Sequence, residues 1–397
     1  MHLVIVSPFP PAITGVGQYG YYITRALAKL GCFSRITVLA GSSINGQKVN
    51  HLGLTEVEYC WEPGQLNARQ VILSRVKRLS PDLVWFNLRM GMFGESPFLS
   101  VSGLLAPMLV RRMGIPTVVT FHEMVELSDL AALNAPGGRL APLGARFITS
   151  LATQADVVCL TMHDHLDWFA KIRPQVDCVH IPHGAVSEPD LLHESDGNEL
   201  LLFNMLAPFK GVELLLEIMP QLKKMHPNLQ LSIAGEEHPR FPGYAKQLRA
   251  RFADVEGVCW LGKIADDDVV DLFRRAKIVV LPYSASTGSS SVLYSAATWG
   301  RAVVASDLRE IRELAQEQNF QIEFFESGNP ASLRDAILRL LDSPDRRQIQ
   351  TQHNFRSIQN ARIEITCDRY LRAFNRALEK RQSPKRIPIP RLETESL

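Results

Sequence analysis

The feature that most constrains the fold is a regular alternation of short apolar runs with longer amphipathic segments. Runs such as Leu3–Val6, Leu83–Phe86 and Thr117–Phe121 are too short for helices and lack the polar alternation of half-exposed strands. A stretch with helical periodicity follows each run, for example Tyr19–Leu30, which stops at Gly31. Buried strands that alternate with helices predict doubly wound parallel sheets, so the expected fold class is α/β.

The alternation occurs in two series of similar size, and a polar stretch that is poor in apolar residues separates them. A chain of 397 residues is long enough for two domains. The predicted organisation is a Rossmann-like domain over residues 1–187, a linker over 188–198, a second Rossmann-like domain over 199–362, a helix over 363–380 that packs back on the first domain, and a disordered tail over 381–397. Two such sheets would face a cleft with their carboxyl edges, where ligands bind in open α/β sheets.

The bulk composition narrows the class of protein. The net charge is only +2, which gives no overall reason to expect a nucleic-acid partner. The six cysteines are scattered without a C-x-x-C pair, a pattern that suits a reducing cytoplasm and predicts neither a disulfide framework nor a metal site. The N-terminus leads directly into a strand, and no run of about 18 apolar residues occurs, so we expect neither a signal peptide nor a spanning helix.

One stretch of the second series combines a strand, a loop of small residues and a helix start. The strand ends at Leu281, a hydroxyl-rich loop opens with Pro282-Tyr283 and reaches Ser291, and a helical pattern continues to Gly300. The first N–H groups of a helix lack internal partners, so they favour a phosphate or another anion in the preceding loop. The alternative is an ordinary connection between a strand and a helix.

The order of the motifs along the chain resembles the retaining glycosyltransferase family 4, which has the GT-B fold. In the N-terminal half, the matching residues are Gly15-Val-Gly17, a strand that ends at His122-Glu123, the segment Ala155–Thr161 and Ile181-Pro-His-Gly184. In the C-terminal half they are Asn204–Gly211, Ala234-Gly235, Trp260-Leu-Gly262 and the stretch Leu281–Ser306.

The resemblance implies transfer of a hexose from a UDP- or GDP-sugar, with retention, to a saccharide or a lipid-linked saccharide. Such a reaction would serve the synthesis of surface polysaccharide or glycolipid. The implied chemistry is front-face departure of the diphosphate, which needs no metal ion, no other cofactor and no carboxylate nucleophile. The implied partners are the donor, the acceptor and, by peripheral contact, the inner membrane surface, so the expected location is the cytoplasm or the cytoplasmic face of the membrane.

The chain departs from the family at three charged positions. The family usually carries two glutamates in its last motif, and the corresponding positions here are Thr287 and Ser295. The usual arginine five residues before Lys210 is Met205. In the family the first glutamate meets the sugar, the second the ribose, and the arginine the diphosphate. We therefore expect altered or weaker recognition of the nucleotide.

The predicted site residues combine these motifs with the physical argument. Together they assign His122 and Lys210 to catalysis and the following residues to donor binding: Gly15, Gly17, Lys210, Gly235, Thr287, Gly288, Ser289, Ser290, Ser291 and Ser295. A diphosphate gains negative charge as it departs, so a cation at Lys210 and a helix start after Ser290 would stabilise it.

Structural alternatives exist for each of these residues. Lys210 could be a solvated loop lysine, and the serines before the helix could simply cap it. His122 could be a hydrogen-bonded structural histidine, and the glycine pair a tight turn between strand and helix. The carboxylates of Glu236-Glu237 could meet the nucleotide or be solvated.

Basic residues recur in the N-terminal half among apolar ones, a pattern that suits a surface facing a lipid leaflet. They are Arg69, Arg75, Lys77, Arg78, Arg111, Arg112, Arg139 and Arg146. The alternative is a set of solvated helix faces. For the whole chain, the main alternative to an enzyme is a non-catalytic GT-B homologue that acts as a glycan-binding or complex subunit. An epimerase or phosphorylase on the same fold is a third possibility.

Overall fold

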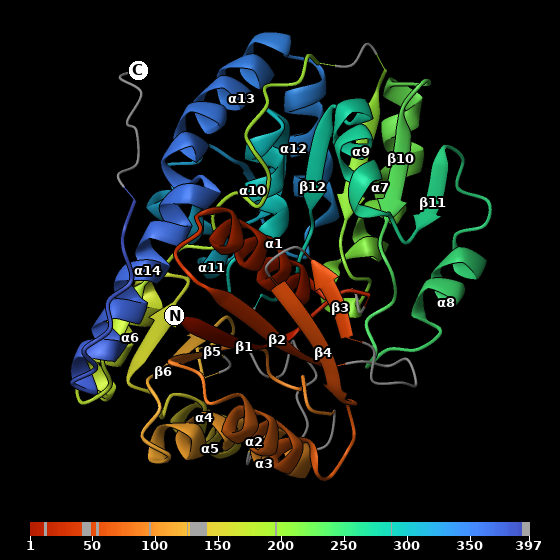
Figure 1. The fold of residues 1–397 in the computed structure, drawn as a ribbon. Coiled ribbons are helices and arrows are strands. Elements are labelled where there is room, and N and C mark those ends of the chain that lie inside the picture. Colours follow the sequence, from red (N-terminus) through yellow and green to blue (C-terminus); the bar gives the residue numbers. More distant parts are fainter. Residues whose placement is uncertain are drawn as a thin grey trace. The chain divides into compact units, whose positions relative to one another are not determined.

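A computed structural model describes residues 1–11, 14–41, 49–52, 55–94, 97–124, 126–127, 141–194, 197–286 and 288–390. These residues form two compact units, each with its own sheet (Figure 1). The first unit combines the described residues up to Val186 with those from Ile363 onward, and the second spans Ser187–Arg362. The first unit is therefore built from two segments that are far apart in the chain.

The sheet of the first unit has the strand order β3-β4-β2-β1-β5-β6-β7-β8, and all described pairs are parallel except β3 with β4. Its strands are β1 (His2–Pro8), β2 (Arg35–Gly41), β3 (Val49–Leu52), β4 (Thr55–Trp61), β5 (Leu83–Leu88), β6 (Thr117–Phe121), β7 (Val157–Leu160) and β8 (Cys178–His180). The chain runs outward from β1 on one side and from β5 on the other. The topological switch point therefore lies between β1 and β5.

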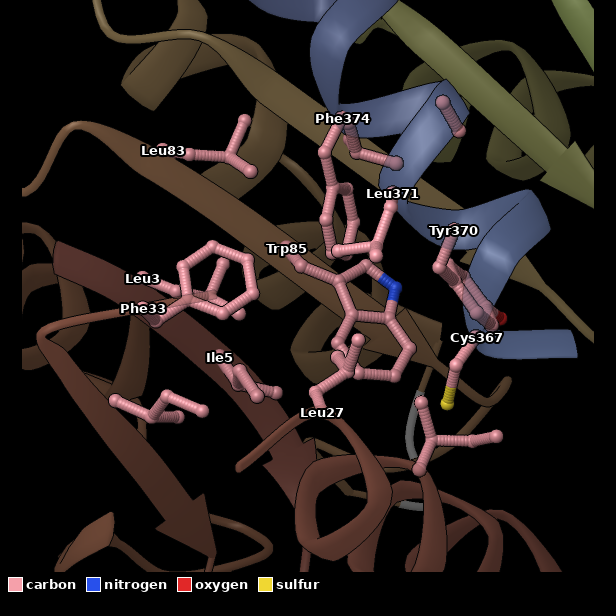
Figure 2. Packing of buried hydrophobic residues seen from close by; sticks show 14 of the residues in the cluster. Leu3, Ile5, Leu27, Phe33, Leu83, Trp85, Cys367, Tyr370, Leu371 and Phe374 are labelled. Atoms are coloured by element: carbon pink, nitrogen blue, oxygen red, sulfur yellow. The ribbon is translucent and has the colours of Figure 1, made fainter. Parts of the chain in front are cut away.

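Helices cover both faces of this sheet, as its central strands, buried on both sides, require. They are α1 (Gly15–Lys29), α2 (Ala68–Leu79), α3 (Pro97–Leu104), α4 (Ala106–Arg112), α5 (Ala141–Ala152), α6 (His163–Ile172) and α14 (Ile363–Lys380). One face packs against α1 and α14, and the other packs against α2 and α4. Figure 2 shows the indole of Trp85, on β5, facing Tyr370, Leu371 and Phe374 of α14.

The tail was predicted to be disordered from residue 381, and for the described residues 381–390 this prediction is wrong. Ile387 is 2% exposed and belongs to the core that also contains α14. The backbone of Ile387 bonds in both directions with the side chain of Asn375, at 2.8 and 2.9 Å. The prolines suggested disorder because the sequence does not reveal that an apolar side chain among them has a core to enter.

The second unit has the strand order β11-β10-β9-β12-β13-β14, and its paired strands are parallel. The strands are β9 (Glu199–Phe203), β10 (Gln230–Ala234), β11 (Val258–Gly262), β12 (Ile278–Leu281), β13 (Ala302–Ser306) and β14 (Glu323–Phe325). The helices are α7 (Val212–Met225), α8 (Tyr244–Arg251), α9 (Val269–Arg275), α10 (Ser291–Thr298), α11 (Arg309–Glu317), α12 (Pro330–Leu341) and α13 (Pro344–Ile358). Its switch point lies between β9 and β12.

The described part of the predicted linker is attached to the second unit. Arg301 is 1% exposed and donates to the carbonyl oxygens of Leu192 and His193. Arg347, also buried, binds the carboxylate of Glu194. Two buried guanidinium groups thus fix this segment, whose polar composition predicted the linker between the domains.

Candidate functional site

Two predicted donor-binding elements meet at the switch point of the second unit. A 3-10 turn over Pro208–Lys210 follows β9, and Tyr283 follows the neighbouring strand β12. The ammonium of Lys210 lies 3.9 Å from the centroid of the Tyr283 ring, which is a cation–π distance. Lys210 is therefore held at the carboxyl edge of the sheet, where open α/β sheets bind ligands.

Asn204 and Tyr283 connect this lysine to other predicted residues. The amide of Asn204 donates to the hydroxyl of Tyr283, and that hydroxyl also hydrogen-bonds with Ser290 at the start of α10. Burial raises the pKa of the Tyr283 hydroxyl, so it stays neutral and can take part in both bonds. One tyrosine thus joins the ends of β9 and β12 to the first turn of α10.

Two glycines let the backbone segments approach at this edge. Gly235 follows β10 with φ +129°, and a Cβ there would overlap the carbonyl oxygen of Asn204. Gly211, after Lys210, has φ +67°, and a Cβ there would overlap the carbonyl oxygen of Pro282. Only glycine combines these positive φ angles with such close approach. Gly235 therefore supports the site through its backbone.

The serines at the helix start do not act as simple caps. Ser290 is the N-cap residue of α10, but its side chain makes no capping bond and instead faces Tyr283. The hydroxyl oxygen of Ser289 is buried and has no hydrogen-bond partner among the described residues. The N–H of Leu293 bonds to the Ser290 carbonyl at 3.1 Å, so among the described residues the N–H groups at the start of α10 that have no side-chain cap are those of Ser291 and Val292. Gly288 accepts through its carbonyl from Ser286, and Thr287 lies outside the described residues.

The departures from the family pattern have local consequences. The hydroxyl of Ser295 donates to the carbonyl of Ser291 in the preceding turn, at 3.1 Å, so it is engaged within its own helix.

Glu237 accepts from the backbone N–H groups of Gly243 and Ala245, which makes it a cap for α8. These two bonds hold the carboxylate of Glu237 against the start of α8, so it is not simply solvated, and they do not direct it at a nucleotide.

In the first unit, His122 follows β6 and is almost fully buried. Its Nε2 lies 2.7 Å from Oδ1 of Asn87, on the adjacent strand β5. The ring of Tyr19 packs edge-on against His122 at 4.8 Å and lies 4.8 Å from the ring of His183. The hydroxyl of Tyr19 reaches Tyr370 of α14 at 2.8 Å. His122 is thus part of a buried polar cluster near the switch point of this sheet.

Burial keeps both histidines of this cluster neutral. Loss of solvent, with a smaller contribution from His183, lowers the pKa of His122 to about 3. Loss of solvent lowers the pKa of His183 to about 4, although the Gly184 carbonyl opposes the shift. An imidazole that stays neutral can offer one donor and one acceptor at physiological pH.

The glycine pair lies in the first turn of α1, which begins at Gly15 and not, as predicted, at Tyr19. Thr14 caps the helix and accepts from the N–H of Gly17 at 2.9 Å. A Cβ at Gly17 would lie 2.8 Å from the Thr14 hydroxyl, whereas one at Gly15 would meet nothing within 4 Å. The carbonyl of Val16, between them, accepts from Asn87, so this turn contacts the residue that holds His122.

The basic residues predicted to face a leaflet are partly ion-paired. Arg75 and Arg78 both bind the carboxylate of Glu58, and Arg111 binds Asp156 at 3.0 Å. Arg139 lies outside the described residues. No described helix is both long enough and apolar enough to span a bilayer. The described side chains also hold no group of three or more His, Cys, Asp or Glu that could bind a metal ion.

Sequence reasoning missed the residues that link the predicted ones, namely Tyr19, Asn87, His183, Asn204 and Tyr283. A usable signal existed for Asn87, a lone amide in an otherwise apolar strand. Tyr283 and Asn204 also follow strands directly, so their position at a carboxyl edge could have been inferred. No local pattern could have predicted the contact between Tyr19 and Tyr370, which are 351 positions apart.

Two family descriptions match the two halves of the chain. "Glycosyl transferase 4-like domain" matches residues 14–184, and "Glycosyl transferases group 1" matches residues 198–343. The two matches follow one another with a short gap at the predicted linker. The chain belongs to the family 4 glycosyltransferases of the GT-B fold. The predicted family and fold are thereby confirmed.

Individual relatives are distant. The phosphatidyl-myo-inositol mannosyltransferase of Propionibacterium freudenreichii is 24% identical over 58% of this chain, a match that spans 56% of that protein. Sucrose-phosphate synthase from Thermosynechococcus elongatus superimposes with a TM-score of 0.74 over 96% of this chain and 100% of its own, at 15% identity. Anabaena HepE, solved with UDP-glucose, gives 0.68 over 93% and 98%, at 16% identity. The structural likenesses establish the fold alone.

Proposed function

We propose that the chain transfers a hexose from a UDP- or GDP-sugar, with retention, to a lipid or lipid-linked saccharide. The observation that carries the proposal is the position of Lys210. Its ammonium lies at the switch point of the unit that matches the group 1 description, beside the open start of α10. A cation and a helix start without a side-chain cap at one sheet edge suit a diphosphate.

The acceptor is proposed from the relatives. The mannosyltransferase of Propionibacterium freudenreichii is named for a phosphatidyl-myo-inositol acceptor. An acceptor of that kind would place the reaction at a membrane surface, and we propose peripheral contact at the cytoplasmic face. Lys77 of α2 and Arg112 of α4 are exposed and support such contact, since Lys and Arg near anionic headgroups are each worth about 1 kcal/mol.

In the proposed reaction each group has a separate task. Lys210 and the first N–H groups of α10 neutralise the negative charge that grows on the departing diphosphate. Tyr283 orients the ammonium through its ring, and Asn204 fixes Tyr283. In the first unit, His122 offers a neutral imidazole to a hydroxyl of the bound saccharide. The reaction needs no metal ion or other cofactor in this scheme.

The proposal is tested with the Lys210→Met variant, which keeps the apolar stem and removes the charge. Purified protein is screened for binding and turnover against UDP- and GDP-hexoses with a phosphatidylinositol acceptor in vesicles. We expect Lys210→Met to lower kcat by about a hundredfold or more, as loss of one charged transition-state contact does. Lys224→Met, at an exposed lysine of α7, is the matched control and should retain full activity. Equal activity of the two variants would refute the role of Lys210.

A second candidate is a non-catalytic homologue that binds a glycan or completes a complex. The observation that favours it is Ser295, whose hydroxyl bonds within its own helix where the family has a glutamate. A Ser295→Glu variant separates the two proposals. Restored or strongly enhanced nucleotide affinity, together with no turnover in the wild type, would favour the non-catalytic homologue.

A further inference from the structure

We infer that Asn87 is a positioning residue that locks the neutral imidazole of His122 in one tautomer, with the proton on Nε2 and a lone pair on Nδ1. His122 would then meet a bound saccharide as a hydrogen-bond acceptor. The neighbours of Asn87 determine which atom of this contact donates and which accepts. Only the identity of the hydroxyl donor rests on the proposed function.

The orientation of the Asn87 amide is set by two acceptors. Its Nδ2 lies 2.9 Å from the carbonyl oxygen of Val16 and 2.9 Å from the hydroxyl oxygen of Ser7. A carbonyl oxygen can only accept, so the NH2 group must face Val16. The Ser7 hydroxyl donates its own proton to the carbonyl of Pro8 at 2.6 Å, so it too receives a hydrogen bond from Asn87. The reversed amide would place oxygen against oxygen at Val16.

The amide orientation determines the histidine tautomer. With Nδ2 committed, the atom of Asn87 that faces His122 is Oδ1, at 2.7 Å from Nε2. An amide oxygen accepts only, so Nε2 carries the proton. Burial disfavours the doubly protonated ring, which leaves Nδ1 without a proton. Each ring nitrogen makes one hydrogen bond, so Nε2 is fully used within the protein.

The ligand is therefore restricted to the acceptor side of the ring. A saccharide hydroxyl can donate to Nδ1, whereas an anionic phosphate oxygen cannot form a favourable bond with a lone pair. The aromatic ring of Tyr19, packed edge-on at 4.8 Å, holds the plane of the imidazole. The structure thus assigns His122 to a neutral, hydroxyl-bearing part of the substrate and not to its diphosphate.

The surrounding backbone is shaped for this arrangement. Gly20, in α1, packs on the side chains that orient the amide, and a Cβ there would lie 2.5 Å from the Ser7 hydroxyl and 2.8 Å from Asn87 Nδ2. The helix therefore approaches so closely that any larger residue would displace the network. The close approach and the three hydrogen bonds of Asn87, two buried and one partly buried, leave its amide a single orientation.

The experiment reads the tautomer directly from two-bond 15N–1H spectra of the full chain labelled at histidine. The His122 signals are assigned by their loss in a His122→Gln variant. In the wild type we expect a protonated Nε2 and an unprotonated Nδ1, without change between pH 5.5 and 8. An Nδ1–H tautomer, or an exchanging mixture of the two forms, would overturn the inference.

Two variants test the role of Asn87. Asn87→Leu keeps similar bulk but offers no acceptor, so we expect the tautomers of His122 to mix. Ser7→Ala, the control, removes a partner of Asn87 that does not touch His122, and the Val16 carbonyl should preserve the tautomer. Retention of the wild-type tautomer in Asn87→Leu would contradict the inference. The spectra of the other histidines report whether each variant is folded.

Ligand binding to His122 is measured separately from its tautomer. Addition of UDP-glucose or GDP-mannose with the acceptor should shift the Nδ1 signal and leave Nε2 protonated. Once turnover is found, Asn87→Leu should lower kcat by roughly tenfold or more with little change in donor KM, since orientation can be worth about a hundredfold. If no sugar binds but the tautomer is as expected, the proposed function fails while the role of Asn87 stands.

Discussion

At the scale of single residues, the first unit keeps two buried histidines neutral, and this makes its folding free energy depend on pH. Both His122 and His183 are nearly inaccessible to solvent, and each contacts the ring of Tyr19. The pKa values of both histidines are lowered in the folded state, whereas a histidine of the unfolded chain takes up a proton near pH 6.5. A site that needs an uncharged imidazole therefore makes this unit sensitive to acid.

The pH dependence has a definite sign. Because the unfolded chain binds more protons below pH 6.5, this stability is fully present above that pH and is lost as the pH falls toward 4. Between pH 6.5 and 5, the free energy of unfolding should fall by about 2 to 4 kcal/mol more in the wild type than in a His122→Gln/His183→Gln double variant. The difference corresponds to about 1.4 kcal/mol per histidine and pH unit. Urea unfolding at several pH values measures the difference.

The control for this prediction is His193→Gln, at an exposed histidine of the second unit. Its stability should follow the wild-type pH profile. Parallel profiles for the wild type and the double variant would show that the buried histidines do not cause the acid sensitivity.

At the scale of elements, helix α14 and the residues that follow it, 381–390, complete the core of the first unit. We call residues 381–390 the strap. Tyr370 of α14 bonds with Thr120 of β6 at 2.8 Å, and Thr120 also receives the indole N–H of Trp85 at 2.9 Å. Beyond α14, Ile387 fills a position in the same core. This arrangement explains how the proline-rich residues 381–390 are held against the first unit.

Ile387→Ala tests whether the strap contributes to stability. We expect the free energy of unfolding of the first unit to fall by about 2–4 kcal/mol, the usual cost of truncating a buried isoleucine. Ile172→Ala is the matched control, because Ile172 is 51% exposed at the end of α6, and it should change stability by less than about 0.5 kcal/mol. Chemical denaturation of both variants provides the comparison. Equal, small effects would mean that the strap is not held in solution.

At the scale of the whole molecule, the two units differ in how the chain builds them. The described residues of the second unit all lie between Ser187 and Arg362 and have their own buried core. The first unit depends on residues from both ends of the chain. Folding of the first unit therefore has to bring together segments separated by the entire second unit, which is entropically costly.

This difference predicts the behaviour of fragments. Residues 187–362 expressed alone should fold and melt cooperatively, because the described contacts of their core lie within the fragment. Residues 1–186 alone should lack a cooperative transition, because the face that receives Tyr370, Leu371 and Phe374 is uncovered. Circular dichroism melts and amide spectra distinguish the outcomes. Addition of a peptide spanning 363–390 should restore structure to the N-terminal fragment, and a cooperative melt without it would contradict the prediction.

Much of this fold followed from local patterns in the chain. Short, mainly apolar runs predicted β1, β5, β6 and β12, because the strands of a parallel sheet covered on both faces are mostly apolar. The same logic predicted Lys210 at a carboxyl edge, since the residues after parallel strands share one edge of the sheet. The described antiparallel pair β3 and β4 was not predicted, because it interrupts the alternation that guided the assignment.

The sequence by itself therefore determined the element types, the two sheets and the edge at which a site would form, because these depend on periodicity within short windows. The tertiary structure decided the pairing of Asn87 with His122, the contact of Lys210 with Tyr283 and the attachment of residues 381–390. The first two contacts join residues 35 and 73 positions apart, and the attachment of residues 381–390 includes Lys385, which binds Asp82 across 303 positions. Asn375 and Ile387, 12 positions apart, are the nearer exception, and even they meet only because the core beside α14 is open to an isoleucine.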